Sequence, residues 1–263
     1  MKQYNSPIIS FLCLLLISAC SVKEQRGGCP VYVNINFDKV IESGSYTNSF
    51  VNVGAVGEEF SGDVDIRQYE AVGLDVPAPR GIIYMSAAFG HESFSCHGDS
   101  LVVKEGAEIS PLFLWADKVL CHDDLYYAEA DPRKQYCKMN IVVVGLNPGE
   151  DFEYALRLKA DCNAISLYGA DALEGNYTVI AKNKNASGYE VLVPRQRENN
   201  IVLELLEDEV SVSLVDVGKE LDANGYDWNK ADLDDVIVVV DFSRMRASVE
   251  IIEWNQSKIE ITI

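Results

Sequence analysis

The sequence predicts an all-β protein made of two antiparallel β-sandwich domains, with at most one or two short helices. Most of the chain consists of short apolar or alternating segments. Turn-forming residues separate these segments, as in Asn147-Pro148-Gly149 and Glu174-Gly175-Asn176. A helix is expected only around Val215–Leu221, with a further turn at Asn229–Asp234. Many short strands joined by turns are typical of sandwiches and not of βαβ units.

The clearest predicted strand follows Pro30. In it Val31, Val33, Ile35 and Phe37 alternate with Tyr32, Asn34 and Asn36, which is the period of a half-buried strand. The other predicted strands are Ser49–Val56, Val64–Glu70, Ile82–Phe89, Ser100–Val103, Ile109–Ala116, Met139–Leu146, Phe152–Ala160, Tyr177–Ala181, Tyr189–Val193, Ile201–Leu206, Asp235–Phe242, Ala247–Trp254 and Lys258–Ile263.

A polar, charged segment, Tyr126–Tyr136, is predicted to separate the two domains. It contains Pro132, and the chain on either side is long enough for one sandwich. The expected domains are residues 31–137 and 138–263.

The N-terminus has the pattern of an exported lipoprotein. An apolar run too short to span a bilayer precedes Ile17-Ser18-Ala19-Cys20, which is similar to a bacterial lipobox. Residues 1–19 are therefore expected to be a signal peptide, Cys20 the site of lipid attachment and residues 20–30 a tether. Acyl chains would hold the protein on the outer membrane, because each buried methylene contributes about 0.8 kcal/mol. The alternative is an ordinary cleaved signal peptide or a short uncleaved anchor.

The formal charge of −19 argues against nucleic acid as a partner, because the chain has no cluster of Lys and Arg to bind phosphates. Five cysteines remain after Cys13 and Cys20, and an exported protein can form disulfides. Spacing does not select the pairs; Cys96–Cys121 and Cys121–Cys137 are both candidate bridges.

No motif indicates an enzyme, a cofactor or a metal site. Cys96-His97 and Cys121-His122 contain ligand types for zinc, but neighbouring strand residues face opposite sides and no second ligand pair has the required spacing. In the acidic segment Glu220–Asp235, Ala231 falls where a calcium loop needs its bidentate Glu. A loose calcium loop and a hydrogen-bonded turn are the two alternatives there.

Aromatic residues offer a second functional hypothesis. Tyr126, Tyr127 and Trp228 could line a sugar-binding face, whereas Trp115 and Trp254 fall within strand patterns and are expected in the core.

Several segments together resemble the lipidated anchor and accessory subunits of type V fimbriae, in the fimbrillin superfamily. They are "CSVKEQRGGCPVYVNINF", "VDIRQYEAVG", "ISPLFLWADKV", "LCHDDLYY", "MNIVVVGLNP" and "GYDWNKADLDDVIVVVDFS". The segment "RQYEAVG" departs from the family pattern of an aromatic-Asp-x-x-Gly run. The resemblance implies two transthyretin-like sandwiches and assembly with fimbrial subunits by β-strand complementation.

Two segments are candidates for strand exchange under this hypothesis. Removal of Val31–Phe37 would open an apolar groove, and Arg26 would be the cut site of an arginine-specific protease. Arg26 as an ordinary tether residue is the alternative. At the C-terminus Ile259, Ile261 and Ile263 alternate with polar residues, which suits a strand given to another chain or the last edge strand of its own sandwich.

The predicted function is that of a fimbrial anchor or accessory subunit on the cell surface, with fimbrial subunits and a host or bacterial surface ligand as partners. The alternative is a carbohydrate- or ligand-binding lipoprotein of a nutrient-uptake system. A periplasm-facing hydrolase ranks last.

Overall fold

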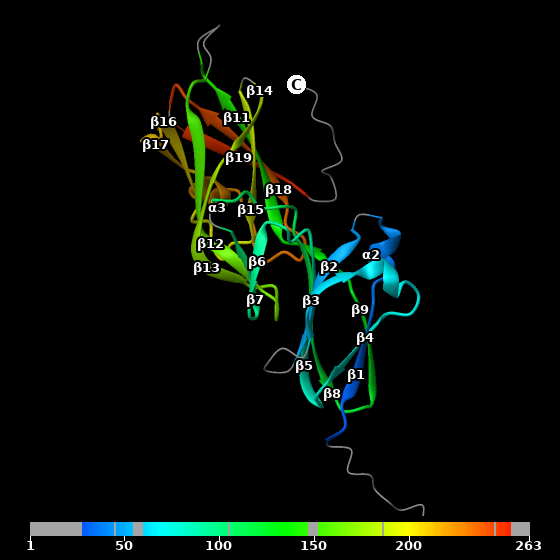
Figure 1. Ribbon diagram of the computed structural model, residues 1–263. Coiled ribbons are helices and arrows are strands. Elements are labelled where there is room, and N and C mark those ends of the chain that lie inside the picture. Colours follow the sequence, from blue (N-terminus) through cyan, green and yellow to red (C-terminus); the bar gives the residue numbers. More distant parts are fainter. Residues whose placement is uncertain are drawn as a thin grey trace, which may run out of the picture.

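The computed structural model describes residues 28–44, 46–54, 60–104, 106–146, 152–185, 187–244 and 246–253. They form two β-sandwiches stacked end to end, with the first in the lower half of Figure 1. Helical structure in this part of the chain is limited to α2 (Asp38–Glu42), the 3-10 turn η3 (Ile66–Tyr69) and α3 (Val217–Ala223). The all-β sandwich prediction is confirmed. None of the helices in the described ranges has the length and apolar character needed to span a membrane.

The first sandwich packs a three-stranded sheet against a five-stranded sheet. The smaller sheet has the order β4 (Leu74–Ala78), β1 (Val31–Asn36), β9 (Leu125–Glu129). The larger sheet has the order β10 (Arg133–Lys134), β8 (Phe113–Cys121), β5 (Gly81–Phe89), β2 (Asn48–Gly54), β3 (Phe60–Asp65). The side chains of Val33, Met85 and Trp115 lie in the apolar core between them.

The second sandwich also has two sheets. One has the order β14 (Lys182–Asn185), β15 (Gly188–Pro194), β11 (Tyr136–Val144), β18 (Asp235–Asp241), β19 (Arg246–Ile252). The other has the order β17 (Val210–Asp216), β16 (Val202–Glu207), β12 (Ala155–Ser166), β7 (Ser100–Val103), β6 (Phe94–His97), and β13 (Ala172–Ile180) also pairs with β12.

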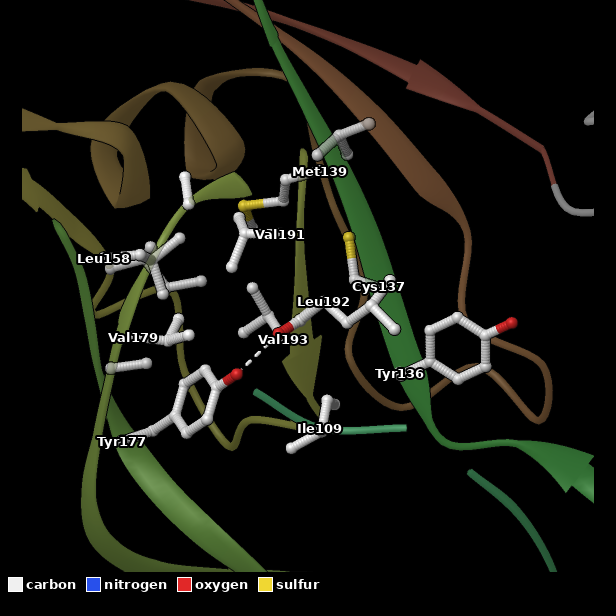
Figure 2. Packing of buried hydrophobic residues seen from close by; sticks show 14 of the residues in the cluster. Ile109, Tyr136, Cys137, Met139, Leu158, Tyr177, Val179, Val191, Leu192 and Val193 are labelled. Carbon is white, nitrogen blue, oxygen red and sulfur yellow. Dashed lines mark hydrogen bonds between the residues drawn. The ribbon is translucent and has the colours of Figure 1, made fainter. Parts of the chain in front are cut away.

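The β6–β7 hairpin precedes the predicted domain boundary, yet β7 pairs with β12 in the second sandwich. Ile109, from the connection that follows β7, lies in the same core as Tyr177 and Val193 (Figure 2). Tyr177 donates a hydrogen bond from its hydroxyl to the Leu192 carbonyl over 2.7 Å, so the polar end of this buried ring has a partner. The domain limits of residues 31–137 and 138–263 remain a prediction. The β6–β7 hairpin falls within the first of these ranges but pairs with a strand of the second sandwich.

Each sandwich contains one parallel strand pair within its otherwise antiparallel sheets. In the first, β1 pairs with β4 in antiparallel and with β9 in parallel orientation. In the second, β11 pairs with β15 in antiparallel and with β18 in parallel orientation. Strands β1 and β11 are thus central in their sheets, each with a partner on both sides.

The segment predicted to separate the domains, Tyr126–Tyr136, consists of strand β9, strand β10 and the first residue of β11. A buried ion pair joins Lys134 to Asp235 at the start of β18, with 2.5 Å between Nζ and Oδ1. The same carboxylate accepts a hydrogen bond from the Lys138 backbone N–H over 2.9 Å. Arg133 and Lys134 thus tie this segment to the second sandwich, because Arg133 also pairs with Asp232.

The helix prediction was shifted. Val215 and Asp216 belong to β17, and α3 begins at Val217 because the Asp216 side chain accepts a hydrogen bond from the Lys219 backbone N–H over 2.9 Å. The sequence pattern missed β17 itself, whose apolar residues face outward.

Candidate functional site

Strand β1 fills the centre of the three-stranded sheet with its apolar face inward. Val31, Val33, Ile35 and Phe37 are fully buried, the last of them one residue beyond the strand. Burial of each such side chain stabilises the fold by about 1.5–3 kcal/mol. Because β4 and β9 both pair with β1, loss of β1 would leave an apolar groove with unpaired backbone groups along both walls.

The outer face of β1 is held by polar contacts with the connection between η3 and β4. Asn34 donates hydrogen bonds from Nδ2 to the Val72 carbonyl over 3.0 Å and to Asp75 Oδ1 over 2.7 Å. Gly73 has a φ of +72°, and a Cβ there would lie 2.4 Å from Asn34 Oδ1. The left-handed glycine thus lets the connection approach the Asn34 amide closely.

Asp38 extends this set of contacts from the start of α2. Its Oδ1 accepts a hydrogen bond from the Ala71 backbone N–H over 2.9 Å, and its Oδ2 accepts one from Asn36 Nδ2 over 3.0 Å. These hydrogen bonds lower the pKa of Asp38 below its usual value of 3.8, because both stabilise the carboxylate. A replacement strand would have to match both the apolar face and these polar partners.

Cys20, Arg26, Ile259, Ile261 and Ile263 lie outside the described residues. Arg26 precedes β1 in the chain, so a cut at Arg26 would separate the sandwiches from Cys20 and leave β1 attached.

A cleft of about 790 Å³ lies where the two sandwiches meet. Its lining comes from β8, the β9–β11 segment, the β12–β13 turn, the residues that follow β15 and the loop before β18. The charged and aromatic residues of the lining are Trp115, Asp131, Arg133, Asp171, Arg195, Arg197, Trp228 and Lys230. Ligand sites occur preferentially at such domain junctions.

Arg195 is a buried residue of the cleft lining that holds the neighbouring loop in place. Its guanidinium is buried and donates hydrogen bonds to Gln135 Oε1 over 2.6 Å, to the Lys230 carbonyl over 2.9 Å and to the Trp228 carbonyl. Burial lowers the pKa of Arg195 because it penalises the charged form. Arg195 therefore fixes the 228–231 loop, and most of its donors are taken up by protein groups.

Arg197 is one of three exposed cations in the lining of the cleft, with Arg133 and Lys230. Its Nε donates to the Ala172 carbonyl over 2.8 Å, which fixes the guanidinium plane at the rim. Among the described residues Arg197 has no carboxylate within ion-pair distance, whereas Arg133 and Lys230 pair with Asp131 and Asp234. Arg197 is thus the side chain best placed to hydrogen-bond a polar ligand.

The predicted aromatic platform is not formed. Trp228 is buried in the second core and donates from Nε1 to Asn199 Oδ1 over 2.7 Å. Tyr127 is 71% exposed on β9 of the first sandwich, and Tyr126 packs partly against the first core. The prediction of a shared face was wrong because these residues belong to different sandwiches and have different burial; Trp254 lies outside the described residues.

The predicted disulfides are also absent. Cys121 and Cys137 are buried thiols and Cys96 is an exposed one. They lie on β6, β8 and β11, which belong to three different sheets, so sequence proximity did not bring them together. Burial raises the pKa of Cys137 to about 12.

The acidic segment that suggested a calcium loop is held by protein groups. The Tyr226 hydroxyl donates to the Asp234 carbonyl over 2.8 Å, and Asp222 Oδ1 accepts from Asn199 Nδ2 over 2.6 Å. Over the described ranges no three His, Cys, Asp or Glu side chains cluster as a metal site would require.

The sequence matches no known protein family and no curated protein. Solved structures do share the fold. The fimbrial anchor protein Mfa2 from Porphyromonas gingivalis is 11% identical with a TM-score of 0.58, over 86% of this chain and 98% of that one. A putative polysaccharide-binding protein from Bacteroides thetaiotaomicron is 11% identical with a TM-score of 0.57, over 87% and 99% of the two chains. A putative adhesin from the same organism is 12% identical with a TM-score of 0.55, over 86% and 97%.

These likenesses extend over both sandwiches and almost the full length of the other chains. They define the class of the molecule by fold: a two-sandwich protein of the kind found in a fimbrial anchor and in putative adhesins. At such low identity they carry no information on individual residues.

Proposed function

We propose that this protein is a cell-surface anchor or accessory subunit of a fimbrium, with a structural and adhesive role and no enzymatic one. It would join fimbrial subunits by β-strand complementation and would be held at the outer membrane by acyl chains on Cys20. The observation that supports this best is the position of β1, a central strand with a fully buried apolar face that directly follows the proposed tether.

The physical basis is the exchange of one strand for another. A partner strand with alternating apolar residues would repair both the apolar groove and the unpaired backbone groups of β4 and β9. The contacts of Asn34 add a requirement, because the incoming strand needs a side-chain donor opposite Asp75. Such a requirement would favour related subunits over unrelated strands.

The membrane part of the proposal concerns Cys20 and the tether. Eight residue steps separate Cys20 from Gly28, the first described residue, and an extended chain spans about 3.3–3.6 Å per residue. The first sandwich would therefore lie within roughly 30 Å of the lipid-bearing residue. The lipid, and not the acidic protein surface, would supply the membrane affinity.

A pull-down from detergent-solubilised membranes tests the assignment, with wild type and Cys20→Ala compared. We expect polymeric fimbrial subunits to copurify with wild type, and the membrane-bound fraction to be lost with Cys20→Ala. Mass spectrometry of the N-terminal peptide should find acyl chains on Cys20. Recovery of only sugar-uptake proteins, or a wild-type peptide without fatty acid, would contradict the proposal.

A covalent staple tests whether β1 is the exchanged strand. Asn34 and Asp75 are paired residues on β1 and β4, so Asn34→Cys with Asp75→Cys allows a disulfide between the two strands. If exchange occurs at β1, the oxidised double variant should lose its fimbrial partners and regain them under reducing conditions. Equal recovery of partners in both states would rule out β1 as the site.

The cleft supports a second candidate function, the binding of a carbohydrate or another polar ligand. Its volume suits a small saccharide, and Arg197 presents a fixed guanidinium at its rim. Binding on a glycan array that disappears with Arg197→Ala, but persists with the distant control Arg246→Ala on β19, would favour this function. No binding by wild type across the array would remove it.

A further inference from the structure

Strand β17 exposes apolar side chains at an edge of the second sandwich. Val210, Val212 and Leu214 are 64%, 48% and 61% exposed. A β-bulge leaves Val212 without a paired residue on β16, so Leu214 shares a face with Ser211, and Val210 shares the other face with Ser213 and the buried Val215. Exposed apolar side chains therefore occur where a solvated edge strand normally carries polar ones.

Apart from the β-bulge at Val212, the edge of β17 has little of the usual protection against added strands. In the described structure β17 stands at the end of its sheet and pairs only with β16. From Val210 to Val215 it contains no lysine, no proline and no other charged residue. Proteins commonly use such residues to keep edge strands from pairing with further chains. Its open edge is suited to accept another strand.

We propose that the C-terminal segment Ser257–Ile263 of the same chain pairs with this edge of β17 as an additional antiparallel strand. The segment has the same length as β17, seven residues, and Ile259, Ile261 and Ile263 give it one apolar face. Placed beside β17, these isoleucines would lie next to its exposed apolar side chains, Leu214 among them. Side chains on neighbouring strands of the same face stabilise a sheet through such cross-strand contacts.

The path of the chain allows this pairing. Strand β19, which precedes the segment, contacts β17 and the adjoining α3. The chain leaves β19 near the 228–231 loop, since Glu253 acts electrostatically on Lys230. β17 ends on the same side of the sandwich. Gly218, just beyond β17, donates a hydrogen bond from its backbone N–H to the Ile201 carbonyl over 2.9 Å. Ile201 is two residues from Asn199, which accepts the hydrogen bond of Trp228 in the 228–231 loop. A segment that starts there and returns along β17 runs antiparallel to it.

The length of chain between β19 and the proposed strand is sufficient. The two sheets of a sandwich lie about 10 Å apart, and the four residues 253–256 span about 13 Å when extended. The C-terminal segment of the same chain is favoured over that of a second copy, because its short connection to β19 gives it an effective concentration on the order of millimolar.

Hydrogen exchange at single-residue resolution tests the proposal on the full chain. In an edge strand every second amide points away from the sheet, so on either side of the bulge at Val212 the amides of β17 fall into one set bonded to β16 and one set facing the open edge. With the C-terminal strand in place, both sets should be protected. In the variant Ile259→Ser, Ile261→Ser and Ile263→Ser, the edge-facing set should exchange at least about tenfold faster, and the β16-bonded set should not change.

The matched control is Lys258→Ser, Glu260→Ser and Thr262→Ser, which alters the other face of the same segment and should leave both sets protected. The β16-bonded amides report in every variant that the sandwich is folded. Edge-facing amides that exchange freely in wild type would overturn the proposal. Protection that disappears on dilution would also overturn it, because it would identify a second copy as the occupant.

Discussion

Strands β1 and β17 have similar sequence patterns and opposite structural settings. β1 alternates apolar and polar residues, lies in the middle of its sheet and buries its apolar side chains completely. β17 alternates valine or leucine with serine, lies at the edge of its sheet and exposes three apolar side chains. Alternation therefore establishes that a strand has two different faces, but not which face meets a core or whether both edges have partners.

The largest expected effect comes from one charge placed on each strand. Val33→Asp puts a carboxylate without a partner into the first core and should destabilise that sandwich by about 4 kcal/mol or more. Val212→Asp, the matched change on β17, should cost about 1 kcal/mol or less because its side chain is half exposed. Urea unfolding followed by fluorescence measures both, since Trp115 and Trp228 lie in different cores. Equal losses would mean that the two strands do not differ as described.

A second prediction concerns the ion pairs near the central strands β1 and β11. Lys134 precedes β11, and Lys134→Ala would leave the buried Asp235 carboxylate without its ion-pair partner, at a cost of about 3–5 kcal/mol. Lys39 near β1 also forms an ion pair, with Glu129 over 2.9 Å, but both side chains are more than half exposed. Lys39→Ala should therefore leave the thermal midpoint unchanged. A similar fall in the thermal midpoint for both variants would contradict the difference in burial between the two ion pairs.

A third prediction tests the outer face of β1. Gly73→Ala should cost roughly 1–3 kcal/mol, because the residue has a φ of +72° and its new Cβ would meet Asn34. Gly62→Ala, on the edge strand β3, has nothing within 4 Å of its Cβ and should change stability by less than about 0.5 kcal/mol. Addition of Asn34→Ala to Gly73→Ala should relieve the steric part of the cost. Full additivity of the two changes would show that they do not touch.

The smallest expected effect is a dependence on pH. Asp38 has a folded pKa below its usual value of 3.8, so its contribution to stability is fully present above that value and is lost as the pH falls through the lower folded pKa. Asp38→Asn should therefore flatten the loss of stability between about pH 4 and pH 2 relative to wild type. Glu209→Gln, on the turn before β17, is the control and should keep the wild-type slope. Thermal unfolding across this pH range gives both slopes.

Much of the fold could be predicted from local sequence. The alternation of Val31–Phe37 predicted β1 and the inward orientation of its apolar residues, and Ser100–Val103 was predicted with the bounds that the structure has. Strand β17 was not predicted, and its last two residues fell within the predicted helix Val215–Leu221, which begins only at Val217, after the Asp216 cap. Strand β6 was also missed, although it forms a local hairpin with β7, and the two residues of β10 gain strand geometry from their pairing with β8.

The candidate sites were less accessible to sequence reasoning. The cleft joins Trp115, Arg197 and Lys230 from three distant parts of the chain, and no spacing in the sequence relates them. The aromatic platform and the disulfides were predicted from proximity in sequence or from residue type. Both failed because the sheets place these residues on separate strands.

The sequence by itself determined that this chain is a two-faced, strand-rich protein with a lipobox-like N-terminus and no catalytic or metal motif, because those properties depend on residue type and local period. Only the tertiary structure decided that β1 is central, that β17 is an open edge and that the β6–β7 hairpin completes the second sandwich. Sheet neighbours are chosen by hydrogen bonds and burial between residues far apart in the chain, and local alternation is the same whichever neighbour a strand finally has.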